Sequence, residues 1–234
     1  AVAPSTAWRP GREIEILRRL VGRHQGKFPK SSLVRIWREM FGALVSLQSR
    51  FVMAVFMPER GAGYLEIARD QYGAYSQSVV CSTVSQVIRE VAEGRATVGI
   101  IPCEIEDKDT PPWWFKQLPT QSPLPKIVSR LPLIGPGEGR GDGKEAYVLA
   151  MMPHDKTGLD RTLIVLECTS AISIGALRGM FEKVGLPLGK IGGNCALHSE
   201  LIVHLAEVEC YVAEDDERLK ALTADEEKRV FRAA

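Results

Sequence analysis

Three polar residues near the N-terminus, Arg12, Glu13 and Gln48, are the first candidates for chemistry. Gln48 stands four residues after Leu44 and eleven after Trp37, so helical geometry predicts that its amide lies on a buried apolar stripe. A buried amide needs hydrogen-bond partners, which a backbone group or a ligand could supply. Arg12 and Glu13 fall in the first turn of an expected helix, where a solvated base and an N-terminal acid are also ordinary. Position alone leaves both interpretations open.

The other reactive side chains have structural interpretations. The cysteines are expected to be small buried hydrophobes. His198 and His204 are expected to be paired surface or edge residues rather than ligands. The glycine-rich stretch 135–143 has neither phosphate-loop spacing nor a following helix, so it predicts a flexible hairpin tip. We expect no metal site and no cofactor.

The amino-acid composition limits the classes of protein to which this chain could belong. The chain has 234 residues, 45% of them hydrophobic and 25% charged, which is typical of a globular protein. A formal net charge of +1 argues against nucleic acid as the main partner. No apolar stretch approaches the roughly 20 residues of a membrane helix and no signal peptide is recognisable, so we expect a cytoplasmic protein without a membrane partner.

The candidate residues belong to a predicted helical hairpin over residues 1–50. Pro10 suits the first turn of one helix, and Ser31 or Ser32 starts a second. The second helix is expected to bury one apolar stripe made of Leu33, Ile36, Trp37, Met40, Leu44, Leu47 and Phe51.

The sequence pattern of residues 51–160 predicts a second structural part of the chain. Apolar runs at 52–56, 79–84, 98–101 and 146–151 alternate with helical periods at 65–72 and 84–91. This alternation is typical of strands and helices over a mainly parallel sheet.

Residues 161–234 predict a third part. Strands at 162–168, around 191, at 201–212 and at 228–232 enclose helices at 174–184 and 215–222. The order β-α-β-β-α-β is that of a ferredoxin-like sandwich. The expected fold class is therefore α+β in several parts.

The N-terminal hairpin resembles the later two helices of the all-helical chorismate mutases. The resemblance rests on Trp8-Arg9-Pro10-Gly11-Arg12-Glu13 and on Ser46-Leu47-Gln48. It implies that Gln48 donates to the breaking ether oxygen, that Glu13 holds the substrate hydroxyl and that Arg12 lies beside the carboxylate-binding set. In that family the site lies in a helical bundle, usually of two intertwined chains.

This sequence departs from the mutase pattern in two ways. The family's first long helix has no counterpart before Arg9, and its serine one turn before the Gln is Leu44 here. Either the given chain begins inside a longer protein, or its helical portion does not act alone.

The middle part resembles the first lobe of prephenate dehydratases, above all in the run Gly94 to Glu104. The family's glycine-rich turn and its Thr-Arg-Phe are replaced, the latter by Lys144-Glu145-Ala146-Tyr147 as the nearest candidate, and a second lobe is absent. We therefore expect a catalytically silent lobe, with Glu104 as a strand-end carboxylate. Residues 113–115, Trp-Trp-Phe, are expected to plug the sheet or to form a partner patch.

The last part resembles an ACT domain, the amino-acid-sensing module of dehydratases. Gly175, Ala176 and Leu177 match its Gly-Ala-Leu at the first helix and are the candidate effector-binding residues. The second effector motif is replaced by Gly192-Gly193-Asn194-Cys195, which favours a retained fold with altered effector binding.

Together these resemblances imply a chorismate mutase in aromatic amino-acid biosynthesis, acting on chorismate as a homodimer. The first alternative is a non-catalytic module that senses an aromatic amino acid or mediates assembly. The second is an active prephenate dehydratase.

Overall fold

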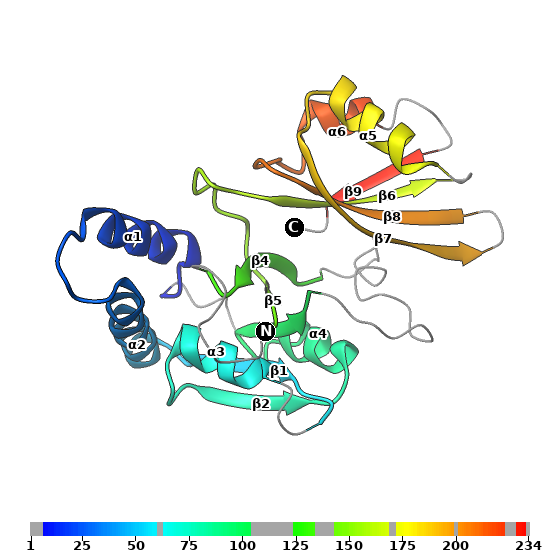
Figure 1. The fold of residues 1–234 in the computed structure, drawn as a ribbon. Coiled ribbons are helices and arrows are strands. Elements are labelled where there is room, and N and C mark those ends of the chain that lie inside the picture. Colours follow the sequence, from blue (N-terminus) through cyan, green and yellow to red (C-terminus); the bar gives the residue numbers. More distant parts are fainter. Residues whose placement is uncertain are drawn as a thin grey trace. The chain divides into compact units, whose positions relative to one another are not determined.

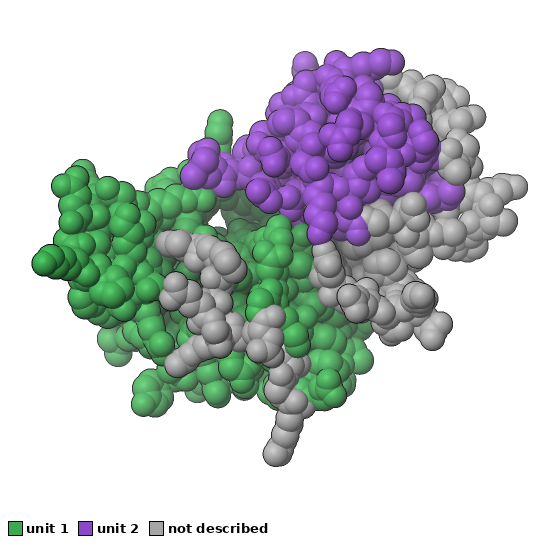
Figure 2. Space-filling model, in the orientation of Figure 1, with its two compact units in different colours: residues 1–104, 123–157 green, residues 105–122, 158–234 purple. Residues whose placement is uncertain are grey.

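The computed structural model describes residues 7–59, 63–103, 124–133, 143–168, 172–198, 201–222 and 228–232. The chain divides into two compact units, coloured separately in Figure 2. Unit 1 comprises residues 1–104 and 123–157, and unit 2 comprises residues 105–122 and 158–234. Glu104 and the aromatic residues 113–115 lie outside the described residues, as does most of the glycine-rich stretch.

Unit 1 begins with the predicted helical hairpin, α1 (Pro10–Arg23) and α2 (Lys30–Gln48). Pro10 occupies the first turn of α1, where a missing N–H costs no hydrogen bond. α1 buries Ile14 and Leu17, as its apolar period predicts.

The second helix buries a different face from the one expected. The residues that α2 buries are Val34, Gly42 and Val45, whereas four residues of the predicted stripe are exposed and only its last member, Phe51, is buried. The exposed fractions of these four are 50% for Ile36, 44% for Met40, 49% for Leu44 and 84% for Leu47. The prediction of a buried stripe was wrong for this chain because backbone proximity at Gly42, rather than side-chain hydrophobicity, decides which face packs.

Gly42 permits this packing because it has no side chain. A Cβ atom there would lie far inside van der Waals contact of the Tyr72 carbonyl oxygen. Both carboxylate oxygens of Glu39 also accept from the Ala74 backbone N–H, at 3.2 Å. The hairpin therefore packs onto the end of α3 (Tyr64–Tyr72), as Figure 1 shows.

The rest of unit 1 is a five-stranded sheet in the order β2-β1-β3-β5-β4. β1 (Val52–Phe56) runs parallel to β2 (Gln77–Cys81) and to β3 (Val98–Pro102). β5 (Ala146–Ala150) is antiparallel to both β3 and β4 (Lys126–Leu131). The predicted parallel strands are present, and the antiparallel pair makes the whole sheet mixed.

Helices cover both faces of this sheet. α3 packs with Met53, Val55 and Ile100 on one face. α4 (Val84–Ala92) packs on the other, where a Cβ at Gly99 would meet Val87 and Val91. Thr83 caps α4 by accepting from the Gln86 N–H at 3.2 Å.

Unit 2 has the ferredoxin-like order that the sequence predicts. Its elements are β6 (Thr162–Cys168), α5 (Ile174–Lys183), β7 (Leu188–His198), β8 (Leu201–Val208), α6 (Glu217–Leu222) and β9 (Lys228–Arg232). The strands form one antiparallel sheet in the order β7-β8-β6-β9. Both helices lie on the same face, over a core that includes Ile164, Leu166, Leu177 and Phe181 (Figure 1). The α+β fold class is thus confirmed.

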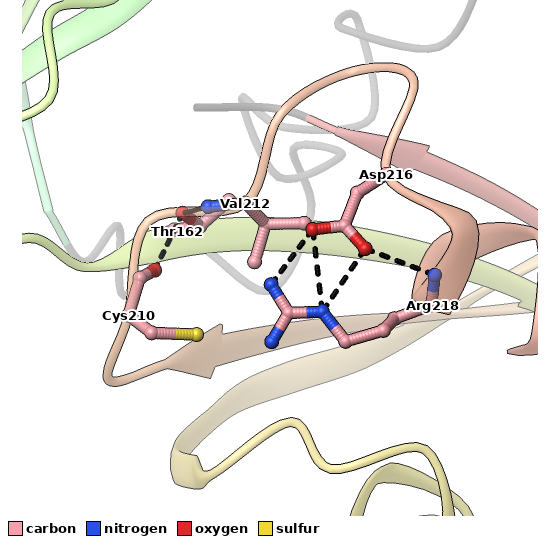
Figure 3. A network of polar contacts seen from close by, with 5 residues as sticks. All are labelled: Thr162, Cys210, Val212, Asp216 and Arg218. Carbon is pink, nitrogen blue, oxygen red and sulfur yellow. Dashed lines mark hydrogen bonds and ion pairs between the residues drawn. The ribbon is translucent and has the colours of Figure 1, made fainter.

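A polar network fastens the segment between β8 and α6 (Figure 3). Thr162 donates to the Cys210 carbonyl at 2.8 Å and accepts from the Val212 N–H at 3.1 Å. Asp216 accepts from the backbone and the guanidinium of Arg218, at 2.9 Å and 2.7 Å. The two bonds of Thr162 tie the return loop to β6, the first strand of the unit, and those of Asp216 tie it to the first turn of α6.

Candidate functional site

One end of the helical hairpin gathers the three sequence-predicted catalytic residues. The rings of Trp8 and Phe51 are 5.9 Å apart, which brings the start of α1 next to the chain that leaves α2. Arg12 and Glu13 lie in the first turn and a half of α1, and Gln48 is the last residue of α2. All three therefore belong to the same end of the hairpin.

The three side chains have different surroundings. Arg12 and Gln48 are exposed, so the amide predicted to be buried is open to solvent within this chain. Glu13 is half-buried, and burial raises the pKa of its carboxyl to about 7. Among the described residues, no hydrogen bond or ion pair joins any two of the three.

Tyr72 is influenced electrostatically by Glu13 and was not among the predicted site residues. Its side chain is buried, and burial raises the pKa of the phenol, with the Glu13 carboxylate adding to the rise. A hydrogen bond with Ser129 and the positive charge of Arg38 act in the opposite direction on that pKa. Tyr72 therefore stays a neutral phenol at any physiological pH.

Arg38 of α2 was also missed. Burial lowers the pKa of its guanidinium, while Asp70 and Tyr72 oppose that change. Its Nε and Nη2 atoms are buried without a hydrogen-bond partner in the described chain, as is Nε1 of Trp8. Arg38 lies four residues before Gly42, on the face of α2 that packs against the rest of unit 1. The sequence signal that could have indicated this buried base is therefore an arginine followed by a glycine four residues later in a helix.

Two further contacts hold α1 in place within unit 1. The guanidinium of Arg18 donates to the carbonyl and to the hydroxyl of Thr157, at 3.2 Å and 3.1 Å. A Cβ at Gly11 would meet the Asp155 side chain at 2.7 Å. The first turn of α1, which carries Glu13, is therefore tightly packed.

The edge of the sheet where the dehydratase resemblance ends carries a different polar cluster. Arg130 of β4 forms an ion pair with Glu145, whose carbonyl accepts from the Cys103 N–H at 3.1 Å. Lys144 lies over the Tyr64 ring, 5.4 Å from its centroid. Glu145, in the stretch that the sequence analysis expects to replace Thr-Arg-Phe, is thus an acid paired with a base.

The candidate effector residues start α5. Ser173 accepts from the Ala176 N–H at 3.2 Å, so that amide is already bonded. Gly175 has no atom within 4 Å of the position a Cβ would take, and Leu177 is a core residue. Among the candidate effector residues, space for a ligand is therefore found at Gly175, in the first turn of α5.

His204 is placed differently from the prediction of a surface or edge residue. It lies on β8, an inner strand, and is buried with no hydrogen-bond partner for Nε2 among the described residues. Burial lowers the pKa of its imidazole. His204 lies opposite Leu166 of β6, a residue of the core under the helices, so its position in the sheet explains its burial.

Cys81, Cys103, Cys168 and Cys210 do not form a disulfide. In the part of the chain that the structure describes, no three His, Cys, Asp or Glu side chains gather as a metal ion would require. No described helix is long and apolar enough to cross a membrane.

Two curated bacterial enzymes are similar to part of this chain. The bifunctional chorismate mutase/prephenate dehydratase of Aquifex aeolicus is 31% identical over 99 residues, which cover 41% of this chain and 27% of that protein. The enzyme of the same name from Neisseria gonorrhoeae is 25% identical over 97 residues, or 42% of this chain and 26% of that protein. The matches thus span about a quarter of these relatives' length. No family model matches the chain.

Solved structures share the fold at low sequence identity. The prephenate dehydratase of Streptococcus mutans matches with a TM-score of 0.53 and 15% identity, over 78% of this chain and 95% of that one. The dehydratase of Arthrobacter aurescens, solved in complex with L-Phe, matches with a TM-score of 0.53 and 11% identity, over 77% and 89%. GqqA, described as a novel type of quorum-quenching acylase, matches with a TM-score of 0.52 and 18% identity, over 80% and 96%. The fold is therefore similar to that of prephenate dehydratases.

Proposed function

We propose that this chain is part of a chorismate mutase, which rearranges chorismate to prephenate in aromatic amino-acid biosynthesis. The observation that carries the proposal is the contact between Trp8, which precedes α1, and Phe51, which follows α2. It brings Arg12, Glu13 and Gln48 to one end of the hairpin. The two bifunctional relatives support the same pathway.

The reaction suits these side chains because it needs neither a covalent intermediate nor a proton transfer. Catalysis consists of holding a dianion in a compact conformer and stabilising charge at the breaking ether oxygen. The exposed amide of Gln48 is the donor to that oxygen, and the Glu13 carboxylate accepts from the substrate hydroxyl. Arg12, which is also exposed, contacts a substrate carboxylate.

A second copy of the chain completes this site in the proposal. The open stripe of α2 ends at Leu47 and Gln48, so a copy that covers the stripe also encloses the amide. Enclosure strengthens hydrogen bonds to a developing charge because it removes competing water. The protein is thus proposed to work as a homodimer.

Assay of chorismate consumption tests the mutase proposal. Gln48→Ala and Glu13→Ala should each lower kcat about 100-fold or more, because each removes a group that contacts the reacting substrate. Gln25→Ala and Glu15→Ala, exposed positions in the hairpin, serve as matched controls. Full activity in both site variants would reject the residue assignment, and absence of turnover in a chain extended upstream would reject the function.

A second candidate is a module that senses an aromatic amino acid through unit 2. It is favoured by the ferredoxin-like order of that unit and by the L-Phe bound to the Arthrobacter dehydratase, whose fold is similar. Calorimetry with phenylalanine, tyrosine and tryptophan separates the candidates. A heat of binding for one of the three amino acids that is lost in Gly175→Trp supports the sensing module. Mutase turnover without a heat of binding for any of them supports the enzyme without a sensing role.

A further inference from the structure

The chain that follows β5 is fastened at successive residues before unit 1 ends. Residues 154–157, called the 154–157 segment below, end at the last residue of unit 1. Nε2 of His154 is hydrogen-bonded to the Ile127 carbonyl of β4, at 2.9 Å. Asp155 and Thr157 both contact α1 instead. The segment is therefore bound to the sheet at its start and to the helical hairpin at two further points.

α1 presents one face to this segment. Gly11 and Arg18 are seven residues apart, which is about two turns of an α-helix, so both lie on that face. A Cβ at Gly11 would lie 2.7 Å from Cβ and 2.9 Å from Oδ2 of Asp155. Nη1 of Arg18 donates to the carbonyl oxygen and to the hydroxyl of Thr157, at 3.2 Å and 3.1 Å. The 154–157 segment thus contacts α1 over two turns of the helix.

The carboxylate of Asp155 also lies at the positive end of α1. The N-cap residue, Arg9, makes no side-chain hydrogen bond to the first turn, and Pro10 has no N–H to offer. A carboxylate beside Gly11 stabilises this end because the backbone N–H groups of a first turn have no partner within the helix. The segment therefore supplies the negative charge that the N-cap residue lacks.

Glu13 lies between these two contacts along α1. The buried face of the helix contains Ile14 and Leu17. A rotation of about 100° per residue puts Glu13 on one side of this buried face and Gly11 with Arg18 on the other. α1 therefore cannot turn about its axis, and carry Glu13 with it, without breaking its contacts to the 154–157 segment.

We propose that Arg18 and Thr157 are positioning residues for the mutase reaction. Through them the 154–157 segment sets the rotation of α1, and hence the direction in which Arg12 and Glu13 meet the substrate. This inference rests on the proposed mutase function and deepens it. The segment belongs to the α/β part of unit 1, which thereby gains a role in the reaction. A small rotation is enough, because a displacement of about 1 Å can lower a rate on the order of 100-fold.

The first test removes the donor. Arg18→Met keeps an unbranched side chain and abolishes both hydrogen bonds to Thr157. It should lower kcat for chorismate about 10-fold or more, with a smaller change in KM, because misdirected groups lose contacts that form only in the transition state. Arg18→Lys can still donate and should recover part of the rate. Arg19→Met, at the exposed neighbouring position, is the matched control and should keep the original kcat.

The second test displaces the segment. Gly11→Ala places a methyl group against Asp155 and should lower kcat, although alanine favours the helix. Asp155→Gly in the same chain removes the three atoms that the methyl group would meet and should restore part of the rate. Gly22→Ala is the matched control, since nothing lies within 4 Å of its Cβ position. Equal kcat values in Gly11→Ala and Gly22→Ala would overturn the inference.

Temperature distinguishes positioning from a loss of stability. The assays are repeated on cooling, to a temperature at which circular dichroism shows every variant to be folded. A lowered kcat in Arg18→Met that persists in the folded protein supports positioning. A loss of rate that disappears on cooling reflects only the unfolded fraction and overturns the inference.

Hydrogen exchange of the backbone amides in the first two turns of α1 gives a readout that needs no turnover. Exchange should be faster in Arg18→Met and unchanged in Arg19→Met, because only the former loses a contact to the 154–157 segment. Equal exchange in both variants would overturn the inference. Turnover that Arg18→Met leaves unchanged would overturn the inference alone, whereas absence of turnover in the unaltered protein would reject the mutase function itself.

Discussion

At the scale of single residues, Glu13 makes folding depend on pH. Its pKa is about 7 in the folded chain, against roughly 4.3 for an unperturbed glutamate. The unfolded chain therefore releases this proton first as pH rises, and stability falls between about pH 4 and pH 7. Below that window the contribution is fully present.

Glu13→Gln should remove this dependence. Relative to the unaltered chain, the variant should gain about 2 kcal/mol in free energy of unfolding between pH 4.5 and pH 8, allowing for the water that reaches a half-buried carboxyl. Denaturant titrations across that range measure the gain. Glu15→Gln, an exposed change on the same helix, should run parallel to the unaltered chain.

His204 predicts the opposite dependence in unit 2. Burial lowers the pKa of its imidazole, so the unfolded chain takes up the proton first as pH falls below about 6.5. Thermal unfolding should show a midpoint that drops from pH 7 to pH 5, and His204→Leu should reduce the drop. An equal drop in both proteins would contradict a buried, unpartnered imidazole.

Residue-level prediction succeeded where the neighbours are local in sequence and failed where they are distant. The short spacing from Pro10 to Glu13 predicts the first turn of a helix, which forms. Tyr72 and Ser129 are 57 residues apart, and nothing in either local pattern links the phenol to Glu13. The mutual ring contacts of Trp8, Phe51 and Tyr72 could therefore be found only from the folded chain.

At the scale of elements, Gly42 determines which face of α2 packs. Gly42→Ala should destabilise unit 1 by about 2–3 kcal/mol, because the added methyl meets the fixed carbonyl of Tyr72. Gly22→Ala is the matched control in α1, since nothing lies within 4 Å of its Cβ position. It should instead stabilise by up to about 1 kcal/mol through helix propensity.

Unfolding free energies of the two variants at one pH give a direct comparison. Equal changes in unfolding free energy in Gly42→Ala and Gly22→Ala would show that α2 does not pack against α3 through Gly42. The same contact explains a limit of the sequence analysis: periodicity located both helices, but a face lined by Val34, Arg38 and Gly42 has too little hydrophobicity to predict burial. A close approach between the backbones of two helices produces no pattern of hydrophobic residues in the sequence.

At the scale of the whole molecule, the open stripe of α2 predicts self-association. Four large apolar side chains on one exposed helix face favour burial against a partner. Leu44→Lys together with Leu47→Lys should shift the protein from dimer to monomer in sedimentation velocity and lower mutase turnover. Tyr75→Lys, a substitution at another exposed residue, should leave the dimer intact, and a monomeric unaltered protein would reject the proposal.

The pairing of the first and last strands of unit 2 has a practical consequence. β6 and β9 are neighbours and antiparallel, with Ile164 opposite Arg232, so the start of the first strand lies beside the end of the last strand. A short bridge could therefore join these ends, and a new opening elsewhere would give a circular permutant with the same strand order. The same proximity of its two ends should allow the sandwich to be inserted into a loop of another protein.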